Sequence, residues 1–561
     1  MLLGLCSVAR TQVPAAFPKG YFRNPLDIPI LLSGNFGELR ANHYHMGFDI
    51  KTQARENLPV YAAADGFVSR IKIEPLGYGR AIYVQHPNGY TTLYAHLNKF
   101  NPGLEKWVKE QQYEKQSWAV NLELTPDLFP VKKGELLAYS GNTGGSQAPH
   151  LHFEIRETAG DINVNPALFG LPVTDNTRPA LTRLAIYDRT RSVFEQTPML
   201  IPVKPSAAGT WVTSPTLITV ASPRISFALG AYDTQTGSSN RNGVFESRLI
   251  VDESPVISFR MDRISYNHTR YLNAHIDYRL RARHNMWVQH LSQLPGHLNS
   301  IYRPLSGDGV ADVSDGKVHN VRIETTDADG NTTILRFRVQ YSGYGLKTTE
   351  QVSGKMFYPN MVDGFETRDC EFYIGERCLY DSVHIKYALS AVTDTAAVSG
   401  IHIIGEPYIP LHEPFLVRIK PNRALTEPEK WRTVMVHTNG SRKSVQKPQW
   451  QQDWAGARFR EFGNFRLVID TMPPEIIPVG FTDGANLSKA SRIVFRVSDN
   501  LGAYKKVRAE LDGKWLMFTN DKGRSFIYQF DEHCPKGEHE LKITAEDEAG
   551  NKAERVFRFI R

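Results

Sequence analysis

The feature that most constrains this chain is the run at residues 149–154, which reads PHLHFE. His150 and His152 stand at positions i and i+2 of an apolar run, and alternate side chains of a β-strand point to the same face. The run therefore predicts a strand that presents two imidazoles together. By itself such a pair favours a structural role beside a sheet, so any chemistry depends on partners elsewhere in the chain.

Those partners stand upstream, where His45 and Asp49 flank Gly47. Imidazole and carboxylate groups both bind zinc, and catalytic zinc sites use three protein ligands plus water. His45, Asp49 and one member of the histidine pair meet that count, and the spacing leaves open which member. The glycine between the first two lets backbone pass close to a site.

A fourth histidine, His96, ends an alternating stretch at residues 90–96. Period-two alternation predicts that it shares a face with Tyr90, Thr92 and Tyr94, and that this face lines a substrate groove.

Three motifs, HxGxD at 45–49, YAHL at 94–97 and PHLHFE at 149–154, occur in the order that resembles the lysostaphin-like (LytM-domain) zinc endopeptidases, which cleave peptide cross-bridges of bacterial cell walls. The resemblance covers about residues 30 to 170. It implies Zn²⁺ bound by His45, Asp49 and His152, with His96 and His150 unligated beside it as catalytic residues. One of these two accepts a proton from water and the other stabilises the tetrahedral intermediate, in an order that the sequence does not assign.

Other residues near these motifs have weaker assignments. Glu154 shares the strand face of His152, where it either orients a ligand or is a core-edge carboxylate, and the second reading is preferred. His43 is expected at the surface or behind the ligands. The cluster Gly141, Gly144 and Gly145 lacks the following helix of a phosphate loop, so it is predicted to form a tight turn beneath the metal.

Two dipeptides, Asp65-Gly66 and Asn88-Gly89, lie between apolar runs and predict type I′ hairpins. Residues 101–130 show helical spacing at Leu104, Trp107 and Val108. Such an insertion either overhangs the groove or packs as a surface helix on the sheet, and both readings stay open.

After Val173 an internal repeat appears, because the segment 317–339 parallels 538–559 at a constant shift of 220 residues. Each copy is a strand, a D-x-x-G-N turn and a strand, which resembles the closing hairpin of bacterial immunoglobulin-like modules. The predicted fold class is mainly β: a lysostaphin-like antiparallel sheet domain with a duplicated hybrid motif, followed by β-sandwich immunoglobulin-like modules. The predicted divisions are 1–16 (leader), 17–173 (peptidase domain), 174–341 (module with insertion), 342–469 (β-rich middle domain) and 470–561 (C-terminal module).

Composition narrows the function classes. The chain has 561 residues, too many for one core, and a net charge of +7 with no dense basic tract, which argues against nucleic-acid binding. No stretch predicts a transmembrane span. The four cysteines are too sparse for a disulfide scaffold, and whether Cys370 and Cys378 are bridged stays open.

These observations predict an exported zinc metalloendopeptidase of the periplasm or cell envelope that hydrolyses stem or cross-bridge peptides of peptidoglycan. The start of the chain looks like the remnant of a signal peptide, while lipidation at Cys6 is a weaker idea. The alternative is a zinc-free LytM-like protein that binds the wall or activates a partner hydrolase. The complete ligand set favours the enzyme, and the β modules offer surfaces for an envelope protein partner.

Overall fold

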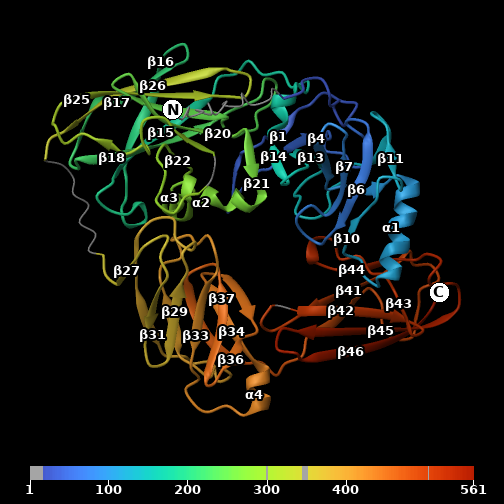
Figure 1. Cartoon of the computed structure of the whole chain (residues 1–561). Coiled ribbons are helices and arrows are strands. Elements are labelled where there is room, and N and C mark those ends of the chain that lie inside the picture. Colours follow the sequence, from blue (N-terminus) through green and yellow to red (C-terminus); the bar gives the residue numbers. More distant parts are fainter. Residues whose placement is uncertain (1–16, 299–300, 344–351, 503) are drawn as a thin grey trace, which may run out of the picture.

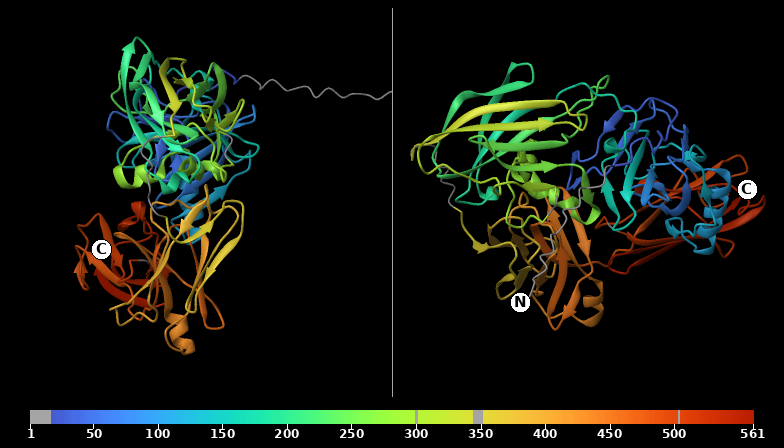
Figure 2. Two further views of the ribbon diagram at one scale, coloured as in Figure 1. Left: turned by 90° about the vertical axis from the view of Figure 1, so that its left-hand side faces the viewer. Right: turned by 45° about the horizontal axis from the view of Figure 1, so that its top comes forward.

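The computed structural model describes residues 17–298, 301–343, 352–502 and 504–561, so the predicted leader and Cys6 lie outside the described residues. Strands dominate every part of the chain, which confirms the mainly β prediction (Figure 1). The four β-rich parts are arranged in a ring, and the C-terminal part returns beneath the N-terminal sheet and helix α1 (Figures 1 and 2). No helix of the described residues is long and apolar enough to cross a membrane.

The N-terminal domain is built on one antiparallel sheet. Its path is β1 (Leu32–Gly34), β4 (Phe48–Lys51), β13 (His150–Glu157), β8 (Tyr90–Ala95), β7 (Arg80–Gln85), β6 (Gly66–Ile73) and β10 (Val120–Glu123), with β11 (Pro130–Val131) beside β6 and β14 (Ile162–Val164) beside β13. Smaller elements are β2 (Leu39–Arg40), β3 (His43–Tyr44), β5 (Pro59–Tyr61), β9 (Lys99–Phe100), β12 (Leu136–Tyr139) and η1 (Pro166–Phe169).

Alternation along β13 separates core from site. Leu151, Phe153 and Ile155 are fully buried in the main hydrophobic core, so His150 and His152 share the opposite face, as predicted. On β8, however, Tyr94 is also in that core, and its hydroxyl accepts a hydrogen bond from the Ala63 amide. The expected groove face of residues 90–96 is therefore wrong.

The hairpin predictions were half right. Strands β7 and β8 pair around Asn88-Gly89, but only Gly89 has a positive φ (84°), whereas a type I′ turn needs two such residues. Around Asp65-Gly66 no hairpin forms, because β5 pairs with β12 while β6 pairs with β7. Local turn chemistry did not reveal these distant partners.

Helix α1 (Pro102–Glu114) fills part of the predicted insertion. The side chain of Asn101 caps it by accepting from the Leu104 amide, and Leu104 and Val108 are buried beneath it. Its outer face contacts the C-terminal module, since the Tyr113 ring stacks on His533 at 3.8 Å and Lys109 pairs with Asp531 at 2.8 Å. The helix in this insertion therefore binds the C-terminal module. Neither of the two predictions for the insertion, overhanging the groove or only packing on the sheet, included this contact.

Residues 174–341 form a large β unit whose two halves are joined by one long strand, β16. Its elements are β15 (Ala180–Asp188), η2 (Val193–Glu195), β16 (Met199–Ala207), β17 (Thr210–Val220), β18 (Arg224–Tyr232), β19 (Glu246–Val251), β20 (Ser254–Arg260), β21 (Arg263–Ser265), η3 (Tyr266–Tyr271), α2 (Leu272–His275), α3 (Tyr278–His284), β22 (Gln289–His290), β23 (Tyr302–Pro304), β24 (Ala311–Asp312), β25 (Val318–Thr326) and β26 (Thr332–Tyr341).

This unit packs tightly against the N-terminal domain. Strand β21 pairs with β14 and so extends the N-terminal sheet, and the hydrophobic core runs continuously between the two parts. Within this unit, η3, α2 and α3 pack behind the HxGxD segment, where the Thr269 hydroxyl accepts from the Tyr44 amide at 2.9 Å. The boundary at Val173 stays a prediction, as does the immunoglobulin-like assignment.

The middle region consists of two five-stranded sheets and a two-stranded pair. Its elements are β27 (Lys355–Phe357), β28 (Asp363–Glu366), β29 (Cys370–Ile374), β30 (Val383–Ile385), β31 (Tyr387–Ser390), β32 (Ile401–Ile404), β33 (Phe415–Ile419), α4 (Glu427–Arg432), β34 (Thr433–Asn439), β35 (Arg442–Gln446), β36 (Gln449–Gln451), β37 (Trp454–Phe459) and β38 (Gly463–Ile469). Cys370 and Cys378 are buried free thiols rather than a bridge.

The C-terminal module has its own core, separate from the main one. Its elements are β39 (Glu475–Val479), β40 (Ala485–Asn486), β41 (Arg492–Ser498), β42 (Tyr504–Leu511), β43 (Lys514–Trp515), η4 (Asp521–Gly523), β44 (Phe526–Gln529), β45 (Glu538–Asp547) and β46 (Lys552–Ile560). The η4 turn reaches the N-terminal domain, where the Lys522 amide donates to Pro75 O at 2.7 Å and Asp521 accepts from the Gly144 amide at 2.7 Å. This contact lies at the glycine cluster just before β13.

Candidate metal centre

Strand register brings the predicted ligands together. β4 and β13 pair antiparallel with Asp49 directly opposite His152, and His45 lies three residues before β4 begins. Gly47 lets this segment lie against β13, because a Cβ on it would come within 2.4 Å of Phe153 O. The predicted close approach of backbone at this glycine is confirmed.

The three donor atoms converge on one point. His45 Nε2 lies 3.0 Å from Asp49 Oδ1 and 3.0 Å from His152 Nδ1, and His152 Nδ1 lies 2.8 Å from the same Asp49 oxygen. All three side chains are buried, at 6% exposure or less. Two nitrogens and one oxygen facing each other this closely could hold a metal ion, and they are of the ligand types that zinc takes.

Both histidines have their other ring nitrogen already engaged. His45 Nδ1 lies 2.7 Å from Asn35 O, and His152 Nε2 lies 2.8 Å from Glu154 Oε1. Since a carbonyl and a carboxylate only accept, each of these nitrogens carries the proton and donates. When both rings are neutral, the lone pairs of His45 Nε2 and His152 Nδ1 are thereby left for a metal ion.

Glu154 is the residue that sequence reasoning undervalued. It is fully buried rather than at a core edge, and its carboxylate collects four donors. These are His152 Nε2 (2.8 Å) and the Tyr78 hydroxyl (2.6 Å) on one oxygen, and Arg156 Nε (2.7 Å) and Asn163 Nδ2 (2.6 Å) on the other. The contact with His152 favours the interpretation in which Glu154 orients that histidine over the core-edge interpretation. Because Tyr78 and Asn163 stand outside the three motifs, no local signal marked them.

The two remaining predicted site residues lie beside the donor set. His150 Nε2 is 3.3 Å from Asp49 Oδ1, and the His96 and His150 ring centroids are 4.7 Å apart. His96 Nδ1 donates to Thr143 O and His150 Nδ1 to Ala148 O, both at 2.8 Å. The Nε2 atom of each ring is therefore unprotonated when the ring is neutral. All five predicted side chains meet in one place.

His96 reaches this place through an unusual backbone conformation. Its φ of 59° breaks the alternation of β8, so its ring contacts His150 and His152 instead of following Tyr94 into the core. A positive φ at a non-glycine residue is uncommon and concentrates at functional sites. By contrast, His43 is exposed and bonds only to Ala41 O, as expected for a surface residue.

Charge in the site is strongly coupled. Burial alone would raise the pKa of Asp49, but the charge and hydrogen bonds of three histidines, His45, His150 and His152, hold this pKa well below its usual range. Burial lowers the pKa of His45 to about 4 and, with His150, that of His96 to about 3. Against the opposing effect of burial, Asp49 and Glu154 raise the pKa of His152 to about 9.

Arg40 is a cation that pairs with the two carboxylates at the edge of the site. Its guanidinium donates to Asp49 Oδ2 at 2.6 Å and contacts Glu38 at 3.4 Å. Asp49 therefore shares one oxygen with the arginine and offers the other, Oδ1, to the histidines. The glycine cluster turns tightly as predicted, since Gly144 (φ 69°) packs so close to the turn around Gly79 that a Cβ would lie 2.2 Å from its nitrogen.

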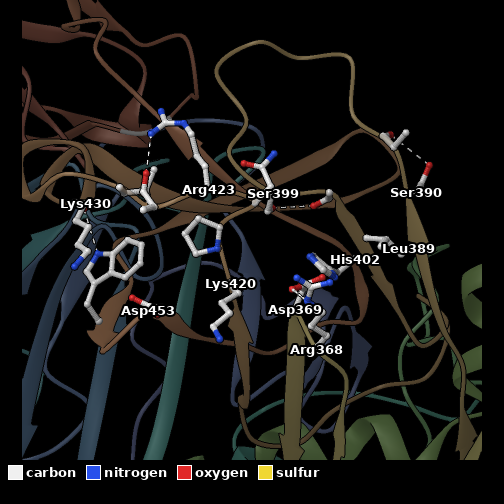
Figure 3. Close-up of a pocket in the computed structure, with 17 residues that line it drawn as sticks. Arg368, Asp369, Leu389, Ser390, Ser399, His402, Lys420, Arg423, Lys430 and Asp453 are labelled. Atoms are coloured by element: carbon white, nitrogen blue, oxygen red, sulfur yellow. Dashed lines mark hydrogen bonds and ion pairs between the residues drawn. The ribbon is translucent and has the colours of Figure 1, made fainter.

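A separate hollow of about 830 Å³ lies in the middle region, far along the chain from these residues (Figure 3). Its wall carries Arg368, Asp369, His402, Lys420 and Asp453. Lys430 and Arg423 at its edge pair with Glu427 and Glu429. None of the five predicted site residues lines it, so it is not part of the metal centre.

Comparison with known proteins agrees with this geometry. Residues 43–114 match the model of peptidase family M23, and residues 354–470 match the model of the Zu5-like domain. An uncharacterized metalloprotease of Haemophilus influenzae is 32% identical over 182 residues, which is 31% of this chain and 32% of that protein. The DD-carboxypeptidase/endopeptidase Mpg of Neisseria meningitidis is 33% identical over 161 residues, 29% of this chain and 28% of that protein.

Two further similarities concern the same region. The peptidoglycan DD-endopeptidase ShyA of Vibrio cholerae is 29% identical over 143 residues, 24% of this chain and 27% of that protein. The catalytic domain of the M23 protein EnpA from Enterococcus faecalis aligns with 26% of this chain and 96% of its own, at 20% identity and a TM-score of 0.20. The chain spans less than a third of the length of each of the three sequence relatives. By its match to the family model at residues 43–114, this part of the chain is a domain of peptidase family M23, the LytM-like metallopeptidases.

Proposed function

We propose that this chain is a zinc metalloendopeptidase that hydrolyses peptide bonds in the stem or cross-bridge peptides of peptidoglycan. One observation carries the proposal: a donor atom from each of His45, Asp49 and His152 lies within 4.8 Å of the others, and both histidines are held in the tautomer that a metal needs. The names of the relatives, which include DD-endopeptidases of peptidoglycan, support the substrate class.

The residues present fit zinc better than a harder cation. Two imidazoles and one carboxylate match the ligand types of catalytic zinc, whereas calcium and magnesium take oxygen ligands almost alone. When bound, zinc supplies a Lewis acid that polarises a carbonyl and lowers the pKa of a water to about 7. Glu154 and Asn35 fix the ligand rings, and Arg40 offsets the charge of Asp49.

His96 and His150 are proposed as the catalytic residues. Each holds its Nδ1 proton against a backbone carbonyl, which fixes the ring and directs Nε2 away from that carbonyl. One ring accepts the proton of the attacking water at Nε2, and the other, when Nε2 also carries a proton, stabilises the charge that develops on the scissile carbonyl oxygen. The HExxH glutamate that serves as base in other zinc peptidases is absent from the sequence.

The zinc-free binding or activator alternative is less consistent with the structure. A domain that had lost zinc would have no reason to keep three convergent donors, their oriented tautomers and the four-donor Glu154 carboxylate. We further propose that the protein is exported to the cell envelope, where peptidoglycan lies, and that the modules after residue 173 contact other envelope components. The division at residues 173, 342 and 470 is part of the same proposal.

The test is digestion of isolated peptidoglycan by purified, zinc-loaded protein, with the soluble products identified by mass spectrometry. We expect peptide fragments with newly formed amino and carboxyl ends from the parent and none from His152→Ala. Intact stem and cross-bridge peptides after incubation with zinc-loaded parent would contradict the enzymatic proposal and favour the binding-protein alternative.

A further inference from the structure

Two clusters of aspartates occupy matching positions in the two repeated modules, far from the metal centre in sequence. The first is Asp175, Asp233 and Asp327, and the second is Asp470, Asp499 and Asp547; within each, one carboxylate oxygen per residue lies within 4.8 Å of the other two. Oxygens that ligate calcium at about 2.3–2.6 Å stand up to roughly twice that distance apart across the ion. Each cluster therefore has the span of one calcium ion before any side chain moves.

The first cluster is buried and lacks a countercharge. Asp233 and Asp327 are 5% and 4% exposed. Among the described residues, no arginine, lysine or histidine pairs with Asp175, Asp233 or Asp327. Carboxylates taken out of water without a partner destabilise the fold, so a cluster like this needs a cation or protons.

Asp233 provides the most direct indication of a cation site. Its Oδ1 atom is buried and accepts no hydrogen bond from any described residue. Burial, with repulsion from Asp175 and Asp327, raises the pKa of Asp233 to about 7. Burial and the same neighbours also raise the pKa of Asp329, which stands two residues after Asp327. An oxygen with this environment is prepared for a metal rather than for a hydrogen bond.

The remaining contacts hold the cluster open instead of neutralising it. Asn331 donates its amide to Asp175 O at 3.2 Å and to Asp327 Oδ2 at 2.8 Å. Asp175 Oδ1 accepts from the amides of Thr177 and Thr236 at 2.9 and 3.2 Å. These neutral donors position the carboxylates but leave their charge in place.

The second module repeats this construction element by element. Asp499 directly follows β41 as Asp233 directly follows β18, and Asp547 begins the second D-x-x-G-N turn as Asp327 begins the first. Asn551 donates to Asp470 O at 3.0 Å and to Asp547 Oδ2 at 2.8 Å, matching Asn331. One difference is Lys447, which donates to Ala549 O at 3.2 Å and lies near Asp547.

We propose that each of these two clusters is a Ca²⁺ site. Calcium takes six to eight oxygen ligands from carboxylates, carbonyls and water, whereas magnesium is bound through one or two carboxylates and keeps most of its water. Three carboxylates in each cluster favour calcium. The first site is the stronger, because the nearby ammonium of Lys447 opposes a second cation at the other.

Each site ties a module to its own entrance. Asp175 and Asp470 belong to the segments that lead from the preceding domain into the module, and one partner of each, Asp327 or Asp547, begins the turn of the module's closing hairpin. Asp470 also donates its amide to Arg432 O in the middle region. Bound calcium therefore stiffens two junctions: the one between the N-terminal domain and residues 174–341, and the one between the middle region and the C-terminal module. Sites of extracellular modules bind with Kd of about 0.1–1 mM, so they respond to calcium outside the cell.

The test counts calcium bound to the full chain by equilibrium dialysis in zinc-containing buffer, up to about 10 mM Ca²⁺. The parent should bind two ions, Asp233→Asn and Asp499→Asn one each, and the double variant none. Glu532→Gln, in an exposed acidic group on the same C-terminal module, is the matched control and should keep both ions. No bound calcium in the parent, or two ions retained by the double variant, would overturn the proposal.

Thermal unfolding separates a cation site from a merely structural aspartate. Calcium should raise the unfolding temperature of the parent and raise that of Asp233→Asn less. Without calcium, Asp233→Asn should be as stable as the parent or more stable, because it removes repulsion and no hydrogen bond at Oδ1. A lower unfolding temperature for calcium-free Asp233→Asn would show that the carboxylate is structural and would overturn the first site. Loss of an ion only in Asp233→Asn would overturn the second.

Discussion

Replacing Glu154 by glutamine probes how the ligand His152 is held. The carboxylate accepts four hydrogen bonds, two on each oxygen, from His152, Tyr78, Arg156 and Asn163. Glutamine keeps one accepting oxygen and replaces the other with an amino group. Whichever way the amide turns, two donors then face a donor, and the His152 ring loses its fixed tautomer or the Arg156 charge loses its buried partner.

The size of the effect follows from these contacts. Removing the partner that orients a ligating histidine costs about 10- to 100-fold in metal affinity, which is about 1.4 to 2.8 kcal/mol of binding free energy. We expect zinc Kd, measured by competition with a chromophoric chelator, to rise by that factor in Glu154→Gln. Peptidoglycan cleavage at limiting zinc should fall in parallel and recover partly with excess zinc.

The matched control is Asp161→Asn. Asp161 pairs with the same Arg156 at 2.9 Å but is 62% exposed and does not touch His152. Its zinc affinity should stay within about twofold of the parent, since surface ion pairs contribute little. A folded Glu154→Gln protein with parental zinc affinity would refute the view that Glu154 sets the His152 tautomer.

Three further predictions concern single side chains. His152→Ala should lose zinc and peptidase activity together, because it removes one of three protein ligands, and metal analysis showing full zinc occupancy would contradict this. His150→Ala and His96→Asn should keep zinc while turnover falls about a hundredfold to ten-thousandfold each. Asparagine is chosen at position 96 because it tolerates the positive φ. Near-parental rates in both variants would show that these histidines only pack. The third prediction concerns Asp233, whose pKa is raised from 3.8 to about 7 in the folded state by burial and by repulsion from Asp175 and Asp327. Between these two pH values the folded state binds more protons than the unfolded state. The stability of the calcium-free protein should therefore fall as pH rises from about 4 to 7. Asp233→Asn should flatten this fall in a series of melting curves, and an unchanged slope would count against it.

The site was more predictable than the fold around it. The HxGxD, YAHL and PHLHFE motifs identified all five convergent side chains, because metal ligands must be particular residue types at particular strand positions. For Glu154 the less suitable of two interpretations was preferred. The sequence around a carboxylate two residues after a predicted ligand does not show whether that carboxylate lies at a core edge or contacts the ligand. Tyr94 was placed on the groove face with His96 because alternation cannot reveal the left-handed backbone conformation of His96 at the end of β8.

Long-range pairing explains the remaining errors. The Asp65-Gly66 turn matched a hairpin, yet β6 found β7 and β10 as better neighbours, and turn residues carry no information about such partners. The docking of the C-terminal module on α1 rests on Tyr113, Lys109, His533 and Asp531, which are ordinary surface residue types in sequence. The pairing of β14 with β21 likewise joins segments about a hundred residues apart. Only the three-dimensional structure shows these contacts.

The central claim is that His45, Asp49 and His152 hold the catalytic metal. A crystal of the full chain grown with zinc, with diffraction recorded on both sides of the zinc absorption edge, tests it most directly. We predict one strong anomalous peak between His45 Nε2, Asp49 Oδ1 and His152 Nδ1. A peak only at the other group that contains a histidine, Asp531, Glu532 and His533, with none between these three atoms, would contradict the account.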